Sequence, residues 1–228
     1  MTNNKARLNL IVDDGGSVEA LQNKIFVSAM NARASYQTTT DIITKLGLQA
    51  GKAFKGNDEL IAFAEQLNKT FAISGTEATG IESTMYNLTQ ALSTGVLRGQ
   101  DLNAVFSNAP QIVQNIADYL NVPIGKIRDM AADGKISAQI VKNAMLKAAD
   151  ETNAKFNKMP MTWNQVFTKM KNIAIKALDP VLNKINALEP EMQKLTDAEL
   201  RAKKDEFQKM LAEGKTLDDI LPEAFAVV

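Results

Sequence analysis

Cysteine and histidine are both absent from this chain of 228 residues. Without cysteine there can be no disulfide bond and no thiolate nucleophile, and the soft ligands of structural zinc sites are missing. Without histidine there can be no acid–base mechanism that depends on an imidazole titrating near neutral pH. Thiol-dependent, imidazole-dependent and disulfide-stapled proteins are therefore excluded as classes.

Long hydrophobic runs are missing too. No run of about 18 apolar residues occurs, so we expect no transmembrane helix. Met1 is followed by polar residues, so we expect no secretory signal peptide and assign the cytoplasm as the default compartment. The hydrophobic fraction of 45% is enough for a core, and the length fits one ordinary domain or two small ones.

The chain has no excess of positive or negative charge, because it contains 26 basic and 26 acidic residues. The whole chain therefore offers no net field to a nucleic acid. The balance hides a split: residues 1–188 carry 20 Lys/Arg and 16 Asp/Glu, net +4, whereas residues 189–228 carry 6 and 10, net −4. A charge asymmetry of this kind is one signal of a domain boundary.

Apolar residues recur at helical spacing almost throughout the chain, which predicts a series of amphipathic helices. The only candidate strand is the short run at 8–12, and Pro180 is expected to kink or break the helix that contains it. The residues expected to cap, start or stop helices are Ser17, Thr40 or Asp41, Asn57, Thr76, Gly95, Pro110, Pro123, Gly134, Ser137, and the pair Thr162 and Gln165 in a capping box.

These patterns predict an all-α fold, a multi-helix bundle of short amphipathic helices with a helical C-terminal extension. The core is expected to form where the apolar stripes meet. Its predicted members are Ile25, Leu67, Phe71, Met85, Leu88, Ile116, Leu120 and Phe167.

The segment GLQAGKA at 47–53 resembles a phosphate-binding loop at first sight. Such a loop needs four residues between its glycines and a Ser or Thr after its Lys, which supplies a magnesium ligand. Here three residues separate the glycines, Ala53 follows Lys52, and no strand precedes the segment. The pattern favours a helix bend over a nucleotide site.

Asp13 and Asp14 are candidate calcium ligands. No further ligand follows them at the spacing of a calcium loop. We therefore interpret them as solvated residues of a turn.

Residues 124–146 have the outline of a helix-turn-helix. In a DNA-binding module, Lys135, Gln139, Lys142 and Asn143 would supply base and phosphate contacts. Asp129 and Asp133 lie in the same segment and would repel phosphate. The alternative, an αα-hairpin that packs against a core, is the favoured interpretation.

Residues 163–178 form a basic amphipathic segment, with three lysines beside Phe167, Met170 and Ile173. A helix of this kind lies on a membrane or binds a partner, or else it is a domain helix with a solvated face, and we favour the last. Trp163 is interpreted as a packing anchor. A membrane contact, if one exists, is expected only through this helix.

No paired carboxylates, nucleophile–base arrangement or metal-ligand cluster stands out in the sequence. We therefore predict no catalytic, cofactor-binding or metal-binding residues, no cofactor, no small-molecule substrate and no enzymatic activity. Nucleic-acid binding is the weaker alternative raised by the helix-turn-helix pattern.

Residues 5–186 resemble a stretch of a tailed-phage tape measure protein. The resemblance implies a structural role without catalytic residues: an extended tail core that sets tail length, recruits tail assembly chaperones and tube subunits or self-associates, and leaves the tail during genome ejection. It implies a location in the host cytoplasm during assembly and then in the virion tail. The segments that carry the resemblance lie at 32–54, 57–120, 125–146 and 159–172.

Residues 185–228 resemble the opening segment of the bacterial preprotein translocase ATPase SecA. The resemblance rests on EPEM, KLTDAEL and LPEAFAVV in that order. Thr196 and Glu199 form a capping-box pair, and Gly214 is the expected stop of the helix that follows them. In that family the nucleotide-binding loop lies further along the chain, so ATPase activity and protein translocation are not carried over to these residues.

The two resemblances meet near Ile185 and Asn186, close to where the charge changes sign. We therefore expect two domains, 1–184 and 185–228, and we expect Val228 to be a cut rather than a natural end. The junction can be natural, engineered or an assembly artefact. A fragment of a SecA motor and a helical DNA-binding module are the alternatives to a phage tail protein.

Overall fold

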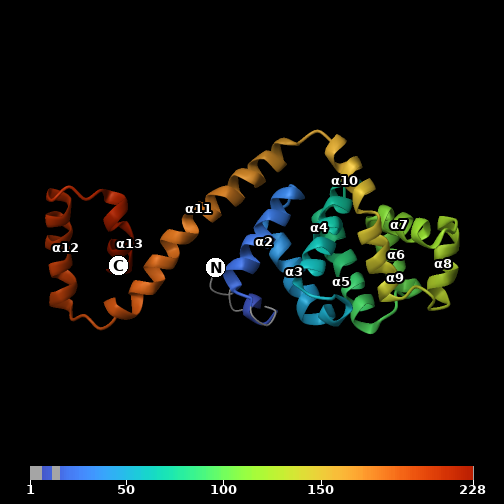
Figure 1. Ribbon diagram of the computed structural model, residues 1–228, viewed down its shortest axis with the longest axis horizontal. Helices are drawn as coiled ribbons and strands as arrows, with labels where there is room; N and C mark the ends of the chain where they lie inside the picture. Colours follow the sequence, from blue (N-terminus) through green and yellow to red (C-terminus); the bar gives the residue numbers. More distant parts are fainter. Residues whose placement is uncertain (1–6, 12–15, 228) are drawn as a thin grey trace. The chain divides into compact units, whose positions relative to one another are not determined.

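The helical spacing of the sequence is realised as a chain of helices in the computed structural model, which describes residues 7–11 and 16–227 (Figure 1). Among these residues no strand forms, and a single antiparallel bridge joins Val96 to Ser137. The predicted all-α class is confirmed. The helices are α2 (Val18–Asn31), α3 (Tyr36–Ala50), η1 (Gly51–Ala53), α4 (Asn57–Ser74), α5 (Ala78–Thr94), α6 (Gly99–Asn108), α7 (Pro110–Leu120), α8 (Ile124–Ala132), α9 (Ala138–Lys147), α10 (Ala149–Lys158), α11 (Trp163–Met192), α12 (Asp197–Ala212) and α13 (Leu217–Val227).

Several helix starts lie where a capping side chain predicts them. The Ser17 hydroxyl accepts a hydrogen bond from the Ala20 N–H, and the Ser137 hydroxyl accepts one from the Ile140 N–H. Pro110 occupies the first turn of α7, where its missing N–H costs nothing. These predictions are confirmed because a cap is a local interaction between residues two or three positions apart.

Three helix starts differ from prediction. Helix α3 begins at Tyr36 rather than at Thr40 or Asp41, because Ser35 is the cap and its hydroxyl accepts from the Thr38 N–H. The hydroxyl of Thr40 donates back to the Tyr36 carbonyl at 2.8 Å, which satisfies it inside the helix.

The caps predicted for the next two helices are shifted. Asn57 is the first residue of α4, after Gly56, and its side-chain amide donates to the Ile11 carbonyl at 2.7 Å. Helix α5 begins at Ala78 rather than at Thr76, whose hydroxyl donates to the Asn108 carbonyl. In both cases the side chain that was predicted to cap a helix instead forms a hydrogen bond with a residue far away in the sequence.

The predicted stops at Gly95 and Gly134 are confirmed. Both residues have positive φ, +90° and +69°, the left-handed conformation that glycine adopts at the end of a helix. A side chain at either position would strain the backbone.

At two places helical structure continues where the sequence raised another possibility. Helix α11 runs through Pro180 without a break, because one missing donor removes one hydrogen bond and leaves the rest of a long helix intact. Residues 7–9, in the only candidate strand, form a helical turn that buries Leu8. Residue 12 of that candidate lies outside the described residues.

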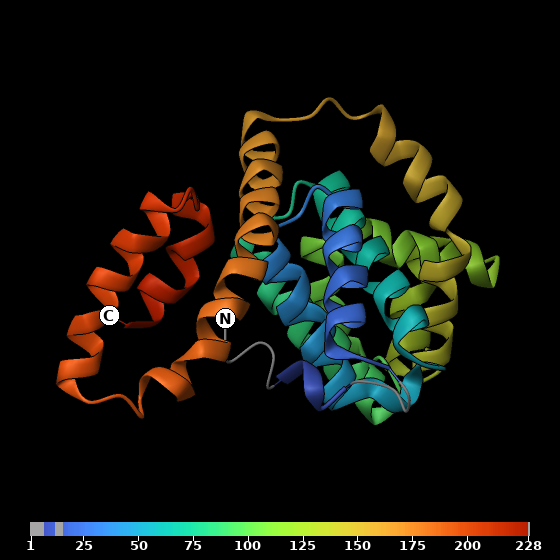
Figure 2. The same ribbon diagram turned by 60° about the vertical axis from the view of Figure 1, so that its left-hand side comes forward.

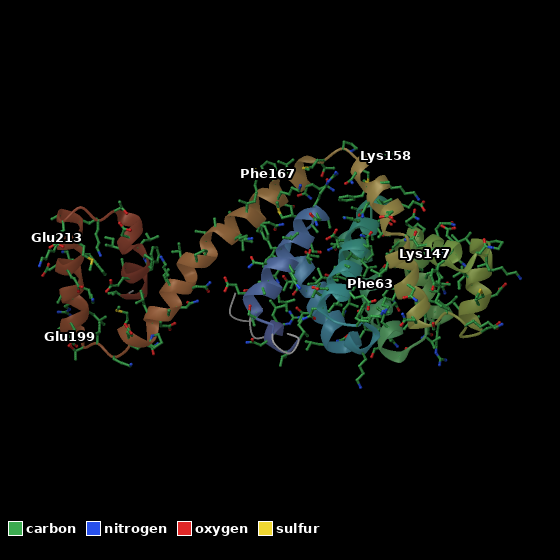
Figure 3. The ribbon with its side chains drawn as sticks, viewed as in Figure 1. Phe63, Lys147, Lys158, Phe167, Glu199 and Glu213 are labelled. Atoms are coloured by element: carbon green, nitrogen blue, oxygen red, sulfur yellow. The ribbon has the colours of Figure 1, made fainter. Side chains whose placement is uncertain are left out.

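The chain divides into two units, 1–169 and 170–228. In the first unit α4 packs against α2, α3, α7, α9 and α10 (Figure 1), and Figure 2 shows the helices of this unit from a second side. Phe63 of α4 is fully buried among them (Figure 3). The second unit ends in a hairpin in which α12 and α13 pack side by side.

The predicted core is largely confirmed. Leu120 is only partly buried, at the edge of the core. Phe167 was predicted wrongly, since its side chain is 64% exposed on α11. The predicted members that are buried in the first unit are Ile25, Leu67, Phe71, Met85, Leu88 and Ile116.

Candidate interaction surface

Helix α11 begins at a reciprocal cap. The Gln165 N–H donates to the Thr162 hydroxyl, and the Thr162 N–H donates to the Gln165 side chain, both at 3.2 Å. This is the predicted capping box, and it fixes the first turn of the helix.

An apolar face of α11 is exposed. Phe167, Met170, Ile173 and Leu178 are 64%, 60%, 54% and 57% exposed. At 3.6 residues per turn they lie along one side of the helix, and we call them the α11 stripe. Figure 3 marks Phe167 near its beginning. Large apolar side chains exposed together on one helix face make this face a candidate interaction surface.

Lysines accompany the α11 stripe. Residues 163–188 contain four lysines and one aspartate. This confirms the basic amphipathic character read from the sequence, but the apolar side faces outward rather than into a core. No described helix is long and apolar enough to cross a membrane. The side chain of Trp163 lies outside the described residues.

The α12–α13 hairpin is built from two capping boxes. The Thr196 N–H donates to the Glu199 carboxylate at 2.8 Å, as predicted. The Thr216 N–H likewise donates to the Asp219 carboxylate at 2.9 Å. In each box the threonine N–H, and then its hydroxyl, lower the pKa of the carboxyl below its usual value.

Lys203 joins the two helices of the hairpin. Its ammonium lies 2.8 Å from Glu206 on its own helix and 2.8 Å from Glu223 on α13. Hydrogen bonds to Glu206 and then to Glu223 raise the pKa of Lys203 above its usual 10.5. The bridge holds α13 against α12.

The predicted recognition helix of the helix-turn-helix pattern packs into the core. Helix α9 packs on α4 and α7 and buries Val141, Ala144 and Met145. Lys142, a proposed phosphate contact, is buried, with its ammonium 2.9 Å from the Glu59 carboxylate. The alternative in which Lys142 contacts DNA is contradicted, because a buried, paired ammonium cannot reach a phosphate.

The remaining polar residues of that pattern make local contacts. The Gln139 amide donates to Asn143, and the Asn143 amide donates to the Tyr119 hydroxyl. Lys135 forms an exposed ion pair with Asp133 at 2.8 Å. The arrangement is that of the αα-hairpin favoured from the sequence.

A second buried cation lies between α4 and α10. The Lys69 ammonium contacts Glu65 at 2.6 Å and the Asn153 side chain at 2.7 Å. The ring of Phe156 is buried beneath Lys69 and Arg33, whose guanidinium lies 4.5 Å from the ring centroid. The sequence reading missed this cluster and Glu59, since neither has a local motif.

The other sequence candidates form no site in the part of the chain that is described. Lys52 is exposed on the short turn η1, between two helices and with no strand before it. Asp13 and Asp14 lie outside the described residues. Among the described residues, no group of three or more His, Cys, Asp or Glu is placed to hold a metal ion.

Surface grooves on the first unit include two that are lined mainly by polar side chains. One, of about 360 Å³, is lined by Gln49, Tyr86 and Gln90 on α3 and α5. The other, of about 140 Å³, is lined by Asp118, Tyr119 and other polar side chains of α7, α9 and α10. Neither combines a nucleophile with a base.

Two family models match the chain, one toward its beginning and one toward its end, and both include residues 163–184. A family model described as a SecA DEAD-like domain matches residues 163–228. The SecA translocase subunit of Roseiflexus sp. (strain RS-1) is 62% identical over 55 residues, 24% of this chain and 5% of that protein. That of Clostridium novyi (strain NT) is 57% identical over 65 residues, 28% of this chain and 8% of that protein. The chain thus spans less than a tenth of these relatives.

No solved structure matches the chain. A family model described as tape measure protein matches residues 1–184, which include the helical core of the first unit and most of α11. Most of the chain is covered by this one model, and so the chain belongs to the tape measure protein family.

Proposed function

We propose that the chain is a non-catalytic structural component of a phage tail that acts in tail assembly and tail length determination. The observation that supports the proposal is the tape measure protein match over residues 1–184. The partners implied are tube subunits, tail assembly chaperones or further copies of the chain, first in the host cytoplasm and then in the virion tail.

The fold of residues 1–169 suggests how this part contributes. Its helices fold back on one another around α4 instead of forming one extended rod. A ruler needs extended length, about 1.5 Å per helical residue. We therefore propose that this unit makes assembly contacts.

Phage that carry single-residue variants of the chain in place of the unchanged chain test the proposal. Leu88→Asp puts a carboxylate at a fully buried position and unfolds the unit, whereas Tyr86→Gln changes an exposed side chain two residues away. Electron microscopy of lysates should show missing or misformed tails for Leu88→Asp and normal tails for Tyr86→Gln. Normal tails in both would refute a role in assembly.

A second candidate function is supported by the SecA-like match: the chain is a fragment of a translocation motor. Both candidates predict no ATP hydrolysis by the purified chain, because the nucleotide-binding loop of the SecA family lies outside the matched segment. The phage replacement separates the two: if the chain is only a motor fragment, Leu88→Asp should leave the tails normal.

A further inference from the structure

The α11 stripe exposes apolar surface along one helix face, from Phe167 to Leu178. Burial of such side chains is favourable in proportion to the apolar area removed from water. A surface of this kind is expected to be covered in the working state of the protein. The question is which molecule covers it.

The chain's own hairpin is too short to reach most of the stripe. Helix α12 has 16 residues, so it extends about 24 Å. Doubled back from the end of α11 at Met192, it would reach roughly the level of residue 176. Phe167, Met170 and Ile173 lie beyond that point.

Charge indicates the partner. Residues 163–188, which contain the stripe, have four lysines and one aspartate, whereas residues 197–227, the α12–α13 hairpin, have five basic and eight acidic residues. The hairpin also has apolar side chains to contribute, since Phe225 is 61% exposed and Leu211 is 38% exposed. An acidic surface with exposed apolar residues complements a basic one.

We propose that the α11 stripe is the docking site for the α12–α13 hairpin of a second copy of this chain. The contact is heterologous, because one copy contributes α11 and the other its hairpin. Each copy has one α11 stripe and one hairpin, so the whole stripe is covered only when the hairpin of another copy docks on it. The proposal rests on α11 and the hairpin and is independent of the role in the tail.

Light scattering coupled to size exclusion tests the association on the full chain. The mean mass should at least double as protein concentration rises from micromolar toward millimolar, and added salt should reverse it, since salt screens the charged partners. Ile173→Asn should keep the chain monomeric. Val27→Asn is the matched control, since Val27 is also about half exposed, at 53% on α2, and should associate like the unchanged protein.

A charge exchange identifies the two surfaces. Lys169→Glu with Lys171→Glu reverses charge beside the stripe, and Asp205→Lys with Glu213→Lys reverses it on the hairpin. Each double variant alone should be monomeric. Mixed together they should associate again, because the reversed α11 then meets a reversed hairpin.

Three results would overturn the proposal. The first is a mass that stays monomeric at every concentration. The second is association that is lost with Ile173→Asn but persists in the hairpin variant Asp205→Lys with Glu213→Lys alone, which would show that two α11 helices pair with each other. The third is a monomer that binds vesicles of anionic lipid, lost with Ile173→Asn, which would show that the stripe meets a membrane.

Discussion

The Nζ atom of Lys142 lies 2.9 Å from an Oε2 atom of Glu59, and the side chain of Lys142 is 2% exposed. The pair joins α9 to α4, 83 residues apart in the chain. The Glu59 carboxylate also accepts the Lys55 N–H at 2.7 Å. The buried Lys142 ammonium is stabilised by the Glu59 carboxylate, and removing either member of the pair leaves the other without its partner.

Removing the carboxylate should therefore be costly. Glu59→Ala leaves the Lys142 ammonium buried without its partner and should lower the unfolding free energy by about 2–4 kcal/mol, below the upper range for fully buried pairs because Glu59 is partly exposed. Lys142→Met, which keeps the aliphatic packing, should cost less. Urea denaturation measures both, and equal costs would contradict the account.

Stability should depend on pH through the same pair. Burial alone would raise the pKa of Glu59, but the Lys55 N–H and the Lys142 ammonium outweigh it, so that the pKa lies below the usual 4.5. A depressed pKa contributes stability that is fully present above 4.5 and is lost as pH falls through the lower, folded-state value. Unfolding free energy measured from neutral to strongly acid pH should fall less in Glu59→Gln than in the unchanged protein. A parallel fall in both would show that Glu59 is not the group responsible.

Replacing an apolar side chain by alanine should lower the unfolding free energy in the core but not in the α11 stripe. Leu88→Ala, at a fully buried position on α5, should cost about 2–5 kcal/mol. Phe167→Ala removes a larger side chain from an exposed position and should leave the unfolding free energy of a dilute sample nearly unchanged. Thermal denaturation at low protein concentration distinguishes them. A large loss for Phe167→Ala would show that the stripe is covered within one chain.

The capping box of α12 should stabilise that helix. Thr196→Ala removes the acceptor for the Glu199 N–H and should destabilise the helix by about 0.5–2 kcal/mol. Hydrogen exchange should then be faster in the first turn of α12. Gln208→Ala, an exposed change in the same helix, is the control and should leave exchange unchanged.

The domain boundary stays a prediction. The sequence places it at 184/185, and we expect residues 1–184 to fold alone and residues 189–228 not to, because a short isolated helix is marginal in water. If the tail docks in the full chain, truncation after Lys184 should lower the melting temperature by roughly 2–4 °C per kcal/mol. Unfolded 1–184, or a stably helical 189–228, would move the boundary.

Local features of this fold could be predicted from the sequence, and distant ones could not. Ser17, Ser137 and the pair Thr196 and Glu199 were correctly predicted as caps, because a cap is decided within four residues. The second box, Thr216 with Asp219, carries the same local signal, but no helix was predicted after Gly214, where α13 forms.

Burial was harder to predict, because the apolar pattern of a helix does not say whether another element covers it. Phe167 has the same helical spacing as the residues that form the core, yet it is exposed. Lys142 lies in a polar pattern, yet it is buried, because its partner Glu59 comes from a helix far away in the sequence. The missed cluster around Lys69 and Phe156 has the same cause.

Mass spectrometry of purified phage tails tests the central claim most directly. If the chain is a structural tail component, peptides from residues 16–169 should be recovered from intact tails, in a ratio to tube protein that stays constant between preparations. Complete tails that contain none of these peptides would contradict the account.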